Sequence, residues 1–235
     1  MVDGCSVKHV GTLDVHSGLG HAFSCATARE KAILLCFPKG NQDKCYLGAT
    51  PFSRFSKITA SHYGHENTYV SASNDHLFVV GSTSGSGSNG LNHKRVELLD
   101  LASGLELDEW KWTKSMDYPF AHHLSLAPTL AHSDGSFYHF GGMMRLNSQE
   151  ELKTTSPFIA SYSPITDQWT MRGELKTARS ASSVIWTESA FLVLGGGLHG
   201  SISPGPNLPE KGEKCEFNDS NQIVCTLQDF ESTSK

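Results

Sequence analysis

The fold of this chain is decided by the stretch Phe137-Tyr138-His139-Phe140-Gly141-Gly142 and by Tyr162-Ser163-Pro164-Ile165-Thr166-Asp167-Gln168-Trp169 further along. A short apolar run that closes on glycine is typical of a buried β-strand, because glycine lets the backbone turn sharply where the strand ends. The second stretch places an aromatic residue on each side of a turn that contains proline, which predicts two further antiparallel strands. The segment therefore predicts a small antiparallel sheet.

The same pattern occurs four times along the chain. Apolar runs that end in small or turn-forming residues lie at 32–37, 76–82, 137–142 and 191–197. Each run follows a strand-like stretch across a short polar turn, and two more strand-like stretches come after it. Four antiparallel strands per repeat are typical of a β-propeller blade. We therefore predict one all-β domain over residues 1–235, with blades at about 17–60, 61–116, 117–177 and 178–235.

The third copy resembles the kelch repeat, in which a double glycine is followed by a tyrosine and then by a tryptophan. Gly141-Gly142, Tyr162 and Trp169 carry this resemblance. The other copies match it in part. The second has Gly81-Ser82, Leu99 and Trp110, the fourth has Gly195-Gly196 and Phe217 without a tryptophan, and the first has Cys36-Phe37 in place of the glycines. The resemblance implies a kelch-type β-propeller, and the alternative is a β-sandwich with unrelated glycine turns.

The number of blades is an open point of this prediction, because kelch propellers usually have more than four. Residues 7–13 resemble the fourth strand of the third copy, so we expect residues 1–16 to form the outer strand of a preceding or closing blade. Three arrangements are compatible with the sequence: a closed propeller of four blades, two chains that pair, and a fragment of a longer propeller, which we favour.

Four of the six cysteines form two pairs that flank predicted hairpin turns. Directly opposed residues of antiparallel strands are close enough for a disulfide. We therefore expect disulfides between Cys25 and Cys36 and between Cys215 and Cys225, although Cys45 competes with Cys25 for Cys36.

The predicted location of the protein follows from these cysteines. Matched pairs indicate an oxidising, extracellular compartment, and Asn218-Asp219-Ser220 is an N-glycosylation sequon. The first residues, Met1-Val2-Asp3-Gly4-Cys5-Ser6, do not resemble a signal peptide. The alternative is a cytoplasmic protein whose cysteines are all reduced.

The bulk composition argues against several classes of function. The 235 residues include 19 basic and 24 acidic side chains, for a net charge of -5. This mild acidity gives no basis for nucleic-acid binding, which needs a basic surface. The longest apolar runs are too short to span a bilayer. No nucleophile elbow, HExxH or Cys-x-x-Cys motif is present in the sequence.

Basic residues recur close to the start of the first predicted strand of each blade; they are His21, His65, His122 or His123, and Arg179. The kelch resemblance implies that this region borders the central opening, where partners commonly bind. We therefore expect these residues to contact polar or acidic groups of a partner, with Arg145 as a further candidate on a neighbouring loop. The structural alternative is that the histidines bond a neighbouring blade. A metal site made by His62 and His65 with His122, His123 or His132 is a sharper version of the same idea.

Taken together, these features predict a non-catalytic module that binds a protein or a glycan, without a cofactor or a bound metal. The alternative is an enzyme of the galactose-oxidase or sugar-epimerase type, with a site at the propeller mouth. The oxidase type needs a cysteine cross-linked to a tyrosine, a second tyrosine and two histidines, and no residue of this chain can be matched to that set.

Overall fold

The computed structural model of the chain describes residues 24–28, 32–36, 45–49, 55–58, 60–65, 68–73, 75–81, 94–101, 110–121, 123–145, 154–197 and 211–229. The regular elements in these ranges are β-strands. Glycine ends, β-branched and aromatic residues and short polar turns produce this outcome, because they favour strands joined by tight turns. The all-β prediction is confirmed.

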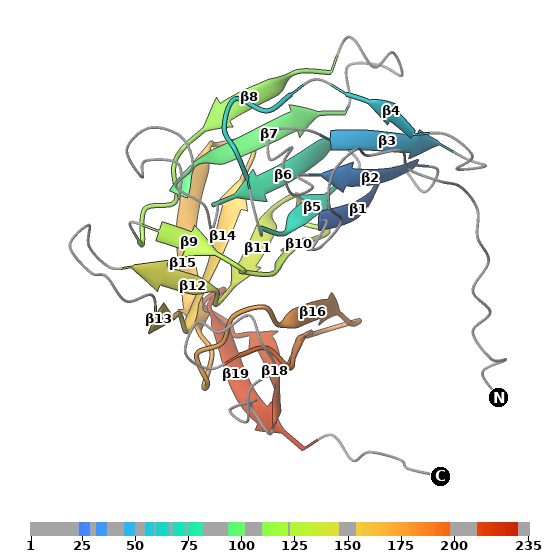
Figure 1. Cartoon of the computed structure of the whole chain (residues 1–235). Coiled ribbons are helices and arrows are strands. Elements are labelled where there is room, and N and C mark those ends of the chain that lie inside the picture. Colours follow the sequence, from blue (N-terminus) through green and yellow to red (C-terminus); the bar gives the residue numbers. More distant parts are fainter. Residues whose placement is uncertain are drawn as a thin grey trace, which may run out of the picture.

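The strands form four antiparallel blades of four strands each, in chain order (Figure 1). Blade one contains β1 (Ser24–Ala28), β2 (Ala32–Cys36), β3 (Cys45–Ala49) and β4 (Phe55–Lys57). Blade two contains β5 (Val70–Ala72), β6 (His76–Val80), β7 (Val96–Asp100) and β8 (Trp112–Ser115). Blade three contains β10 (Thr129–Ala131), β11 (Phe137–Phe140), β14 (Phe158–Ser163) and β15 (Gln168–Glu174). Blade four contains β16 (Ser183–Trp186), β17 (Phe191–Leu194), β18 (Gly212–Phe217) and β19 (Ile223–Gln228).

A smaller sheet lies beside blade three and consists of β9 (His123–Ser125), β12 (Met143–Arg145) and β13 (Thr154–Thr155). Blades three and four are further joined by parallel pairing of β15 with β19, at Gly173 with Ile223 and at Glu174 with Val224. Gly173 permits this approach, because a Cβ atom there would collide with the Ile223 carbonyl oxygen.

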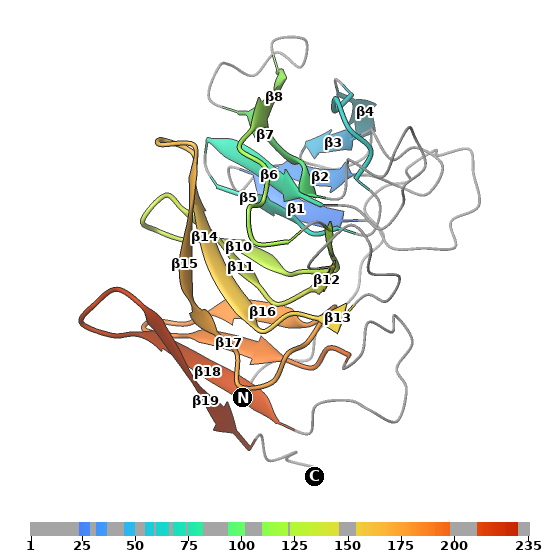
Figure 2. The ribbon, with the colours of Figure 1, turned by 90° about the vertical axis from the view of Figure 1, so that its left-hand side faces the viewer.

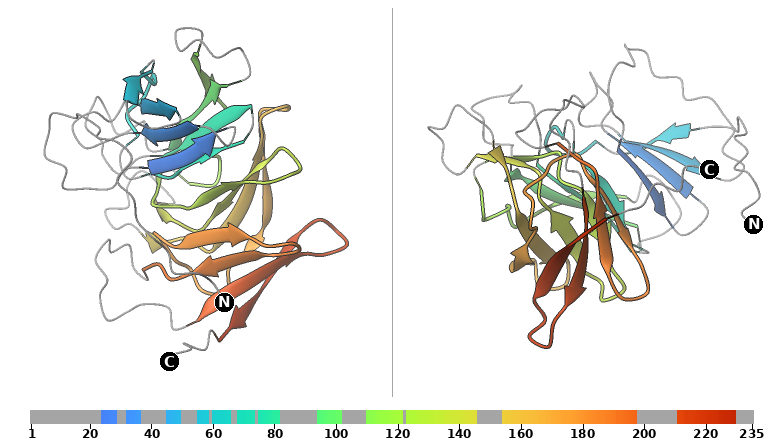
Figure 3. Two further views of the ribbon diagram at one scale, coloured as in Figure 1. Left: turned by 90° about the vertical axis from the view of Figure 1, so that its right-hand side faces the viewer. Right: turned by 90° about the horizontal axis from the view of Figure 1, so that it is seen from below.

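The blades follow one another around an arc, as Figures 2 and 3 show. Their inner strands contact in succession, β1 with β5, β5 with β10 and β10 with β16. Apolar side chains fill the space between adjacent blades in three separate clusters. The middle cluster stacks Phe78 of blade two on Phe137 of blade three, with ring centroids 4.7 Å apart. Each blade is therefore stabilised mainly by its neighbours, as expected of repeat architecture.

The strand register corrects two details of the expected repeat. In blade three Tyr162 pairs with Trp169 across the hairpin, and Tyr162 also faces Phe137 on the second strand. The residue that faces the second strand in the same way is Leu99 in blade two and Cys215 in blade four. Leu99 pairs with Trp112, so Trp112 and not Trp110 holds the tryptophan position. In blade four Cys215, and not Phe217, holds the tyrosine position.

The register also decides the disulfides. Cys215 and Cys225 face each other in β18 and β19 and are bonded, as predicted. The predicted bond between Cys25 and Cys36 is wrong, because Cys36 is bonded to Cys45, with Cα atoms 4.0 Å apart. The physical reason is a one-residue offset: Cys36 faces Cys45 directly, whereas Cys25 faces Leu35.

Several expectations lie outside the described residues, namely the strand at 7–13, His21 and His122. The boundaries of the blades and the number of blades in a complete propeller stay predictions. Within the ranges that the structure describes, no helix is long and apolar enough to cross a membrane.

Candidate functional site

The segments that link successive blades gather at the end of the sheets where the second strands close on glycine. We call this end the glycine face and define it by residues 60–65, 68–69, 116–121, 123–128 and 176–182. A hydrogen bond from Ala181 N to the Leu126 carbonyl (2.7 Å) joins two of these segments, and a bond from Gly142 N to the Arg179 carbonyl (2.8 Å) ties one of them to the end of β11. Gly142 has a φ of +99°, and a Cβ atom there would lie 2.5 Å from the Ala127 Cβ. The second glycine of the pair thus makes room for the linking segment of its own blade.

A buried glutamate anchors the linking segment of blade two. Glu97 is completely buried on β7 and accepts hydrogen bonds from the backbone N–H groups of His62 (2.8 Å) and Tyr63 (3.0 Å). His65 Nε2 lies 2.9 Å from the same carboxylate, and His65 Nδ1 lies 2.8 Å from the Gly81 carbonyl oxygen. The His65 ring therefore links the Glu97 carboxylate on the third strand to the Gly81 carbonyl at the end of the second strand. Burial by itself raises the pKa of Glu97, but the bonds from His65 and His62 outweigh burial and hold this pKa below its ordinary value.

Blade four repeats this arrangement with different side chains. Glu213 on β18 accepts the backbone N–H groups of Lys176 (2.7 Å) and Thr177 (2.9 Å) and the Nη2 of Arg179 (2.8 Å). Arg179 Nη1 donates to the Gly195 carbonyl (3.1 Å), as His65 bonds Gly81 in blade two. Buried charges are tolerated only when they are paired and hydrogen-bonded, and both glutamates meet that condition.

Blade three has an apolar pair at the equivalent positions. Ala160 faces His139 across the strands, as Glu97 faces Val79 and Glu213 faces Val193. In blade three the second glycine, Gly142, lies against Ala127, and Leu124 is three residues before Ala127. In blade four Gly196 lies against Ser182, and Arg179 is three residues before Ser182. Leu124 and Ala160 are both buried in the same cluster. The charged pair is therefore one of two ways in which this chain secures a linking segment.

These contacts revise part of the predicted partner site. His65 and Arg179 are 0% exposed, so their side chains support the glycine face from within and do not reach its surface. The structural alternative, in which the histidines bond a neighbouring blade, does not describe His65 either, because its ring bonds Gly81 and Glu97 of its own blade. The other predicted residues are placed only in part. His123 pairs with Arg145 between β9 and β12, and Arg145 is partly exposed, whereas the His123 side chain lies outside the described residues.

A group that the sequence analysis missed lies on the exposed side of the Glu97 anchor. It consists of His62, Tyr63, Arg95 and Lys114, and we call it the blade-two patch. The His62 side chain is 45% exposed, and its Nδ1 lies 2.7 Å from Glu97 Oε1. The Tyr63 ring centroid lies 5.2 Å from Arg95 Cζ and 5.1 Å from Lys114 Nζ, within the range of cation–π attraction. From the sequence, His62 is named only as a potential metal ligand, and a second signal for the patch is the basic pair Lys94-Arg95 just before the third strand of blade two.

Strained backbone marks the inner part of the glycine face. Leu126 and Ala181 have φ angles of 52° and 53°, and they occupy the same position in blades three and four. Positive φ in residues other than glycine costs about 1–3 kcal/mol and persists only where the surrounding structure holds it. Ser182 accepts a bond from Tyr69 of blade two at its carbonyl (3.2 Å). Hydrogen bonds therefore connect the linking segments of three blades.

Comparisons with known proteins agree with this geometry. No family model matches the chain. Kelch-like protein 15 of human, mouse and rat is 26% identical over 145 residues, an alignment that covers 57% of this chain and 22% of those proteins. The solved structure described as "Structure of YjhT" superposes with a TM-score of 0.61 at 18% identity, over 78% of this chain and 52% of that one. This chain has the fold of a kelch-type β-propeller. It spans about a fifth of the length of the curated kelch-like relatives.

The fourth repeat of this kelch propeller replaces the aromatic signature with a covalent bond. Cys215 and Cys225 occupy the positions that Tyr162 and Trp169 hold in blade three. Tyr162 and Trp169 are in ring contact, with centroids 5.3 Å apart. The disulfide thus joins the same two strands at the same point of the repeat.

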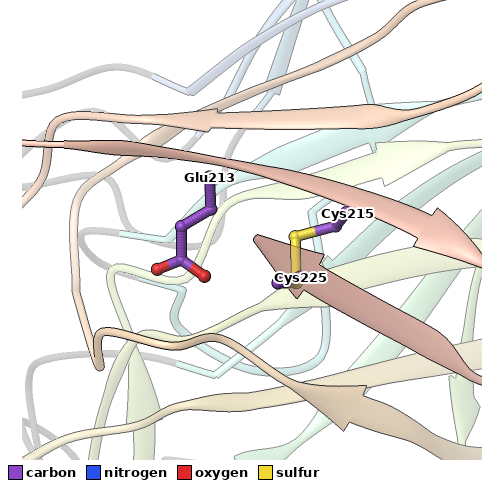
Figure 4. Close-up of side chains that lie close together, drawn as sticks. All are labelled: Glu213, Cys215 and Cys225. Atoms are coloured by element: carbon purple, nitrogen blue, oxygen red, sulfur yellow. A yellow bond between two sulfur atoms is a disulfide. The ribbon is translucent and has the colours of Figure 1, made fainter. Parts of the chain in front are cut away.

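The same two cysteines belong to the one set of potential metal ligands that lies close together in the described part of the kelch propeller. Figure 4 shows them beside Glu213. The potential ligand atoms of the three residues lie within 4.8 Å of one another. Both sulfur atoms are used in the disulfide, and the Glu213 carboxylate already accepts three hydrogen bonds. Zinc and copper sites with cysteine need thiolates, so this set does not fit a metal while the disulfide is intact.

Proposed function

We propose that this kelch propeller is a non-catalytic binding module that recognises an acidic protein partner through the blade-two patch. The observation that carries the proposal is the composition of the patch, in which a partly buried tyrosine contacts two cationic side chains beside an exposed histidine. Tyrosine and arginine are enriched at the energetically important centres of protein interfaces. Acidic groups of a partner complement Lys114, whereas Arg95 is already paired with Asp117 (2.8 Å).

The comparison between blades supports a role beyond folding. In blade four the anchor uses only the backbone of Lys176 and Thr177, together with the Arg179 side chain. In blade two the His62 ring adds a further bond to Glu97. The anchor does not require this second bond, because the His62 backbone N–H already binds Glu97. The bond from the ring instead fixes the orientation of a half-exposed side chain. A side chain that a buried carboxylate already orients loses less conformational entropy when a partner binds.

We further propose that the module works outside the cell or in the secretory pathway. Two disulfides, Cys36–Cys45 and Cys215–Cys225, support this location, because disulfides persist in oxidising compartments.

A quantitative capture experiment tests the partner proposal. Wild-type protein, His62→Ala and Lys114→Glu are immobilised, and proteins retained from the extracellular fraction of the source tissue are compared by mass spectrometry. We expect at least one acidic protein whose retention falls about tenfold or more on both variants, which corresponds to a contact of about 1.4 kcal/mol. Lys214→Glu is the control, because Lys214 is another lysine whose side chain reaches solvent (39% exposed), and it lies on β18 of blade four.

The same samples separate the alternatives. Equal retention of every captured protein on the wild type and on both patch variants would refute the role of the patch. Saturable binding on a glycan array that the patch variants abolish would reassign the partner to a carbohydrate. Turnover of sugar substrates by the purified protein would replace the binding module with an enzyme.

A further inference from the structure

The hairpin of β18 and β19 carries the single Asn-x-Ser/Thr triplet of the chain, Asn218-Asp219-Ser220. All three residues are exposed, at the turn that joins the two strands. Figures 2 and 3 show this turn projecting from the body of the propeller. The triplet is therefore accessible from several sides, which an acceptor site for a large oligosaccharide requires.

The hydrogen bonds of the turn leave the reactive atom of Asn218 uncommitted. Asn218 Oδ1 accepts bonds from Ser220 N (3.0 Å) and Gln222 N (2.9 Å). The Asn218 backbone N–H donates to the Gln222 carbonyl (2.8 Å), and the Asn218 carbonyl accepts from Asn221 N (2.9 Å). In the described part of the chain Asn218 Nδ2 has no such partner. The turn thus holds the side chain by its oxygen and leaves its nitrogen in solvent.

A second, independent feature of the same hairpin is the Cys215–Cys225 disulfide, which closes a loop of sequence separation 10 around the triplet. Disulfides form in oxidising compartments such as the lumen of the secretory pathway. Asparagine glycosylation of Asn-x-Ser/Thr triplets marks surface loops of secreted proteins. Both features therefore belong to one cellular compartment.

From these observations we infer that Asn218 is an N-glycosylation site. The oligosaccharide donor is a lipid diphosphate-linked sugar. In the transfer, Asn218 Nδ2 forms a bond to the anomeric carbon of the sugar and loses one proton to a base. The bond from the anomeric carbon to the diphosphate oxygen breaks, and the lipid diphosphate leaves with the electron pair of that bond.

The glycan lies far from the proposed partner surface. β18 begins at Gly212, beside the glycine face, and ends at Phe217 just before the turn. A strand of this length spans about 20 Å. The glycan therefore projects from the opposite end of blade four and leaves the blade-two patch uncovered. Its presence does not depend on what the patch binds, so either proposal can fail without the other.

The test expresses the chain behind a cleavable leader in the secretory pathway of eukaryotic cells. Secreted and endoplasmic-reticulum fractions are both digested, treated with peptide N-glycosidase in heavy-oxygen water and mapped by mass spectrometry. We expect Asn218 to be recovered as heavy-oxygen-labelled aspartate, together with a gel shift of one glycan before treatment. Mapping both fractions keeps the test valid if secretion is poor.

Two variants at Ser220 isolate the hydroxyl that the triplet needs. Ser220→Ala removes the hydroxyl but keeps the backbone N–H that bonds Asn218, so we expect loss of the glycan from a folded protein with the Cys215–Cys225 bond intact. Ser220→Thr restores the triplet and is expected to carry the glycan. Unmodified Asn218 in both fractions of wild-type protein would overturn the inference, as would a glycan that persists in Ser220→Ala.

Discussion

The buried pair of Arg179 and Glu213 offers the most direct test of how the linking segments are held. We expect Glu213→Ala to lower the free energy of unfolding by about 3–5 kcal/mol, the usual cost of breaking a buried ion pair. The reason is that Arg179 is 0% exposed and would keep its charge without a counter-charge. The backbone N–H groups of Lys176 and Thr177 would lose their acceptor as well.

The partner substitution is expected to cost less. Arg179→Leu leaves the Glu213 carboxylate with two backbone donors, so we expect a loss of about 2–4 kcal/mol, mostly from bonds to a charged group. The double variant Arg179→Leu/Glu213→Ala buries no charge and reproduces the Leu124–Ala160 pair of blade three. Its remaining cost is the two unpaired N–H groups, about 3 kcal/mol together. The cycle therefore predicts a coupling of at least about 2 kcal/mol.

Urea unfolding, followed by tryptophan fluorescence and by circular dichroism, measures the four free energies, with equal m-values as the condition for comparing them. Glu216→Ala is the matched control, because it breaks the partly exposed Lys214–Glu216 pair on the same strand and is expected to change stability by less than about 1 kcal/mol. Additive single effects, or a Glu213→Ala variant as stable as Glu216→Ala, would refute the ion-pair account.

Three further predictions concern the blade cores. Burial lowers the pKa of His139 to about 3, and the hydrogen bond with the Gly141 backbone offsets only part of this shift. In the unfolded chain the pKa of this histidine is about 6.5, so its protonation does not reduce the free energy of unfolding above that pH. Below it the free energy of unfolding falls as pH drops toward 3, by about 2 kcal/mol at pH 5. His139→Val should remove this slope in urea titrations between pH 4 and 7, and an unchanged slope would exclude His139. Replacing Cys215 and Cys225 with alanine should lower the free energy of unfolding by about 3 kcal/mol, the value for a disulfide that spans a separation of 10 residues. Replacing them with tyrosine and tryptophan should lower it by less. Equal losses of stability for the two variants in non-reducing urea unfolding would contradict the equivalence to the aromatic pair. Gly142→Ala should lower the free energy of unfolding by about 3 kcal/mol, because the new methyl group would lie 2.5 Å from the Ala127 Cβ. Gly135→Ala should lower it by only about 1 kcal/mol, because Gly135 has a φ of +84° but no atom within 4 Å of its Cβ position. Equal shifts of the two variants in thermal unfolding would mean that the backbone φ alone sets the cost.

Sequence reasoning worked best where the signal is local. The apolar runs that end in glycine were identified as strands because the residues that make a strand and its turn are adjacent in the chain. Cys215 and Cys225 were paired correctly for the same reason, since one short turn separates their strands. The resemblance to kelch repeats depended on a spacing within one hairpin, from Tyr162 to Trp169.

Sequence reasoning was least successful where two strands must be aligned across a longer connection. Cys36 lies between β1 and β3, and its true partner became apparent only from the register of β2 with β3. Likewise, the sequence interpretation placed Trp110 at the tryptophan position of blade two, and the pairing of Leu99 selects Trp112 instead. A shift of one residue turns a side chain to the other face of a sheet, so small errors in spacing exchange one candidate for another.

The sequence by itself determined that this protein is built from four-stranded repeats, because glycine ends, short apolar runs and polar turns act over a few residues. Only the tertiary structure decided which recurring basic residues are buried and which are exposed. His65 and Arg179 point inward because a glutamate, 32 and 34 residues further along the chain respectively, faces each of them from the third strand of the same blade. His62, three residues before His65, is half exposed on the other side of the same carboxylate. Contacts between residues so far apart in the chain depend on how the strands pair, and the order of the residues does not reveal them.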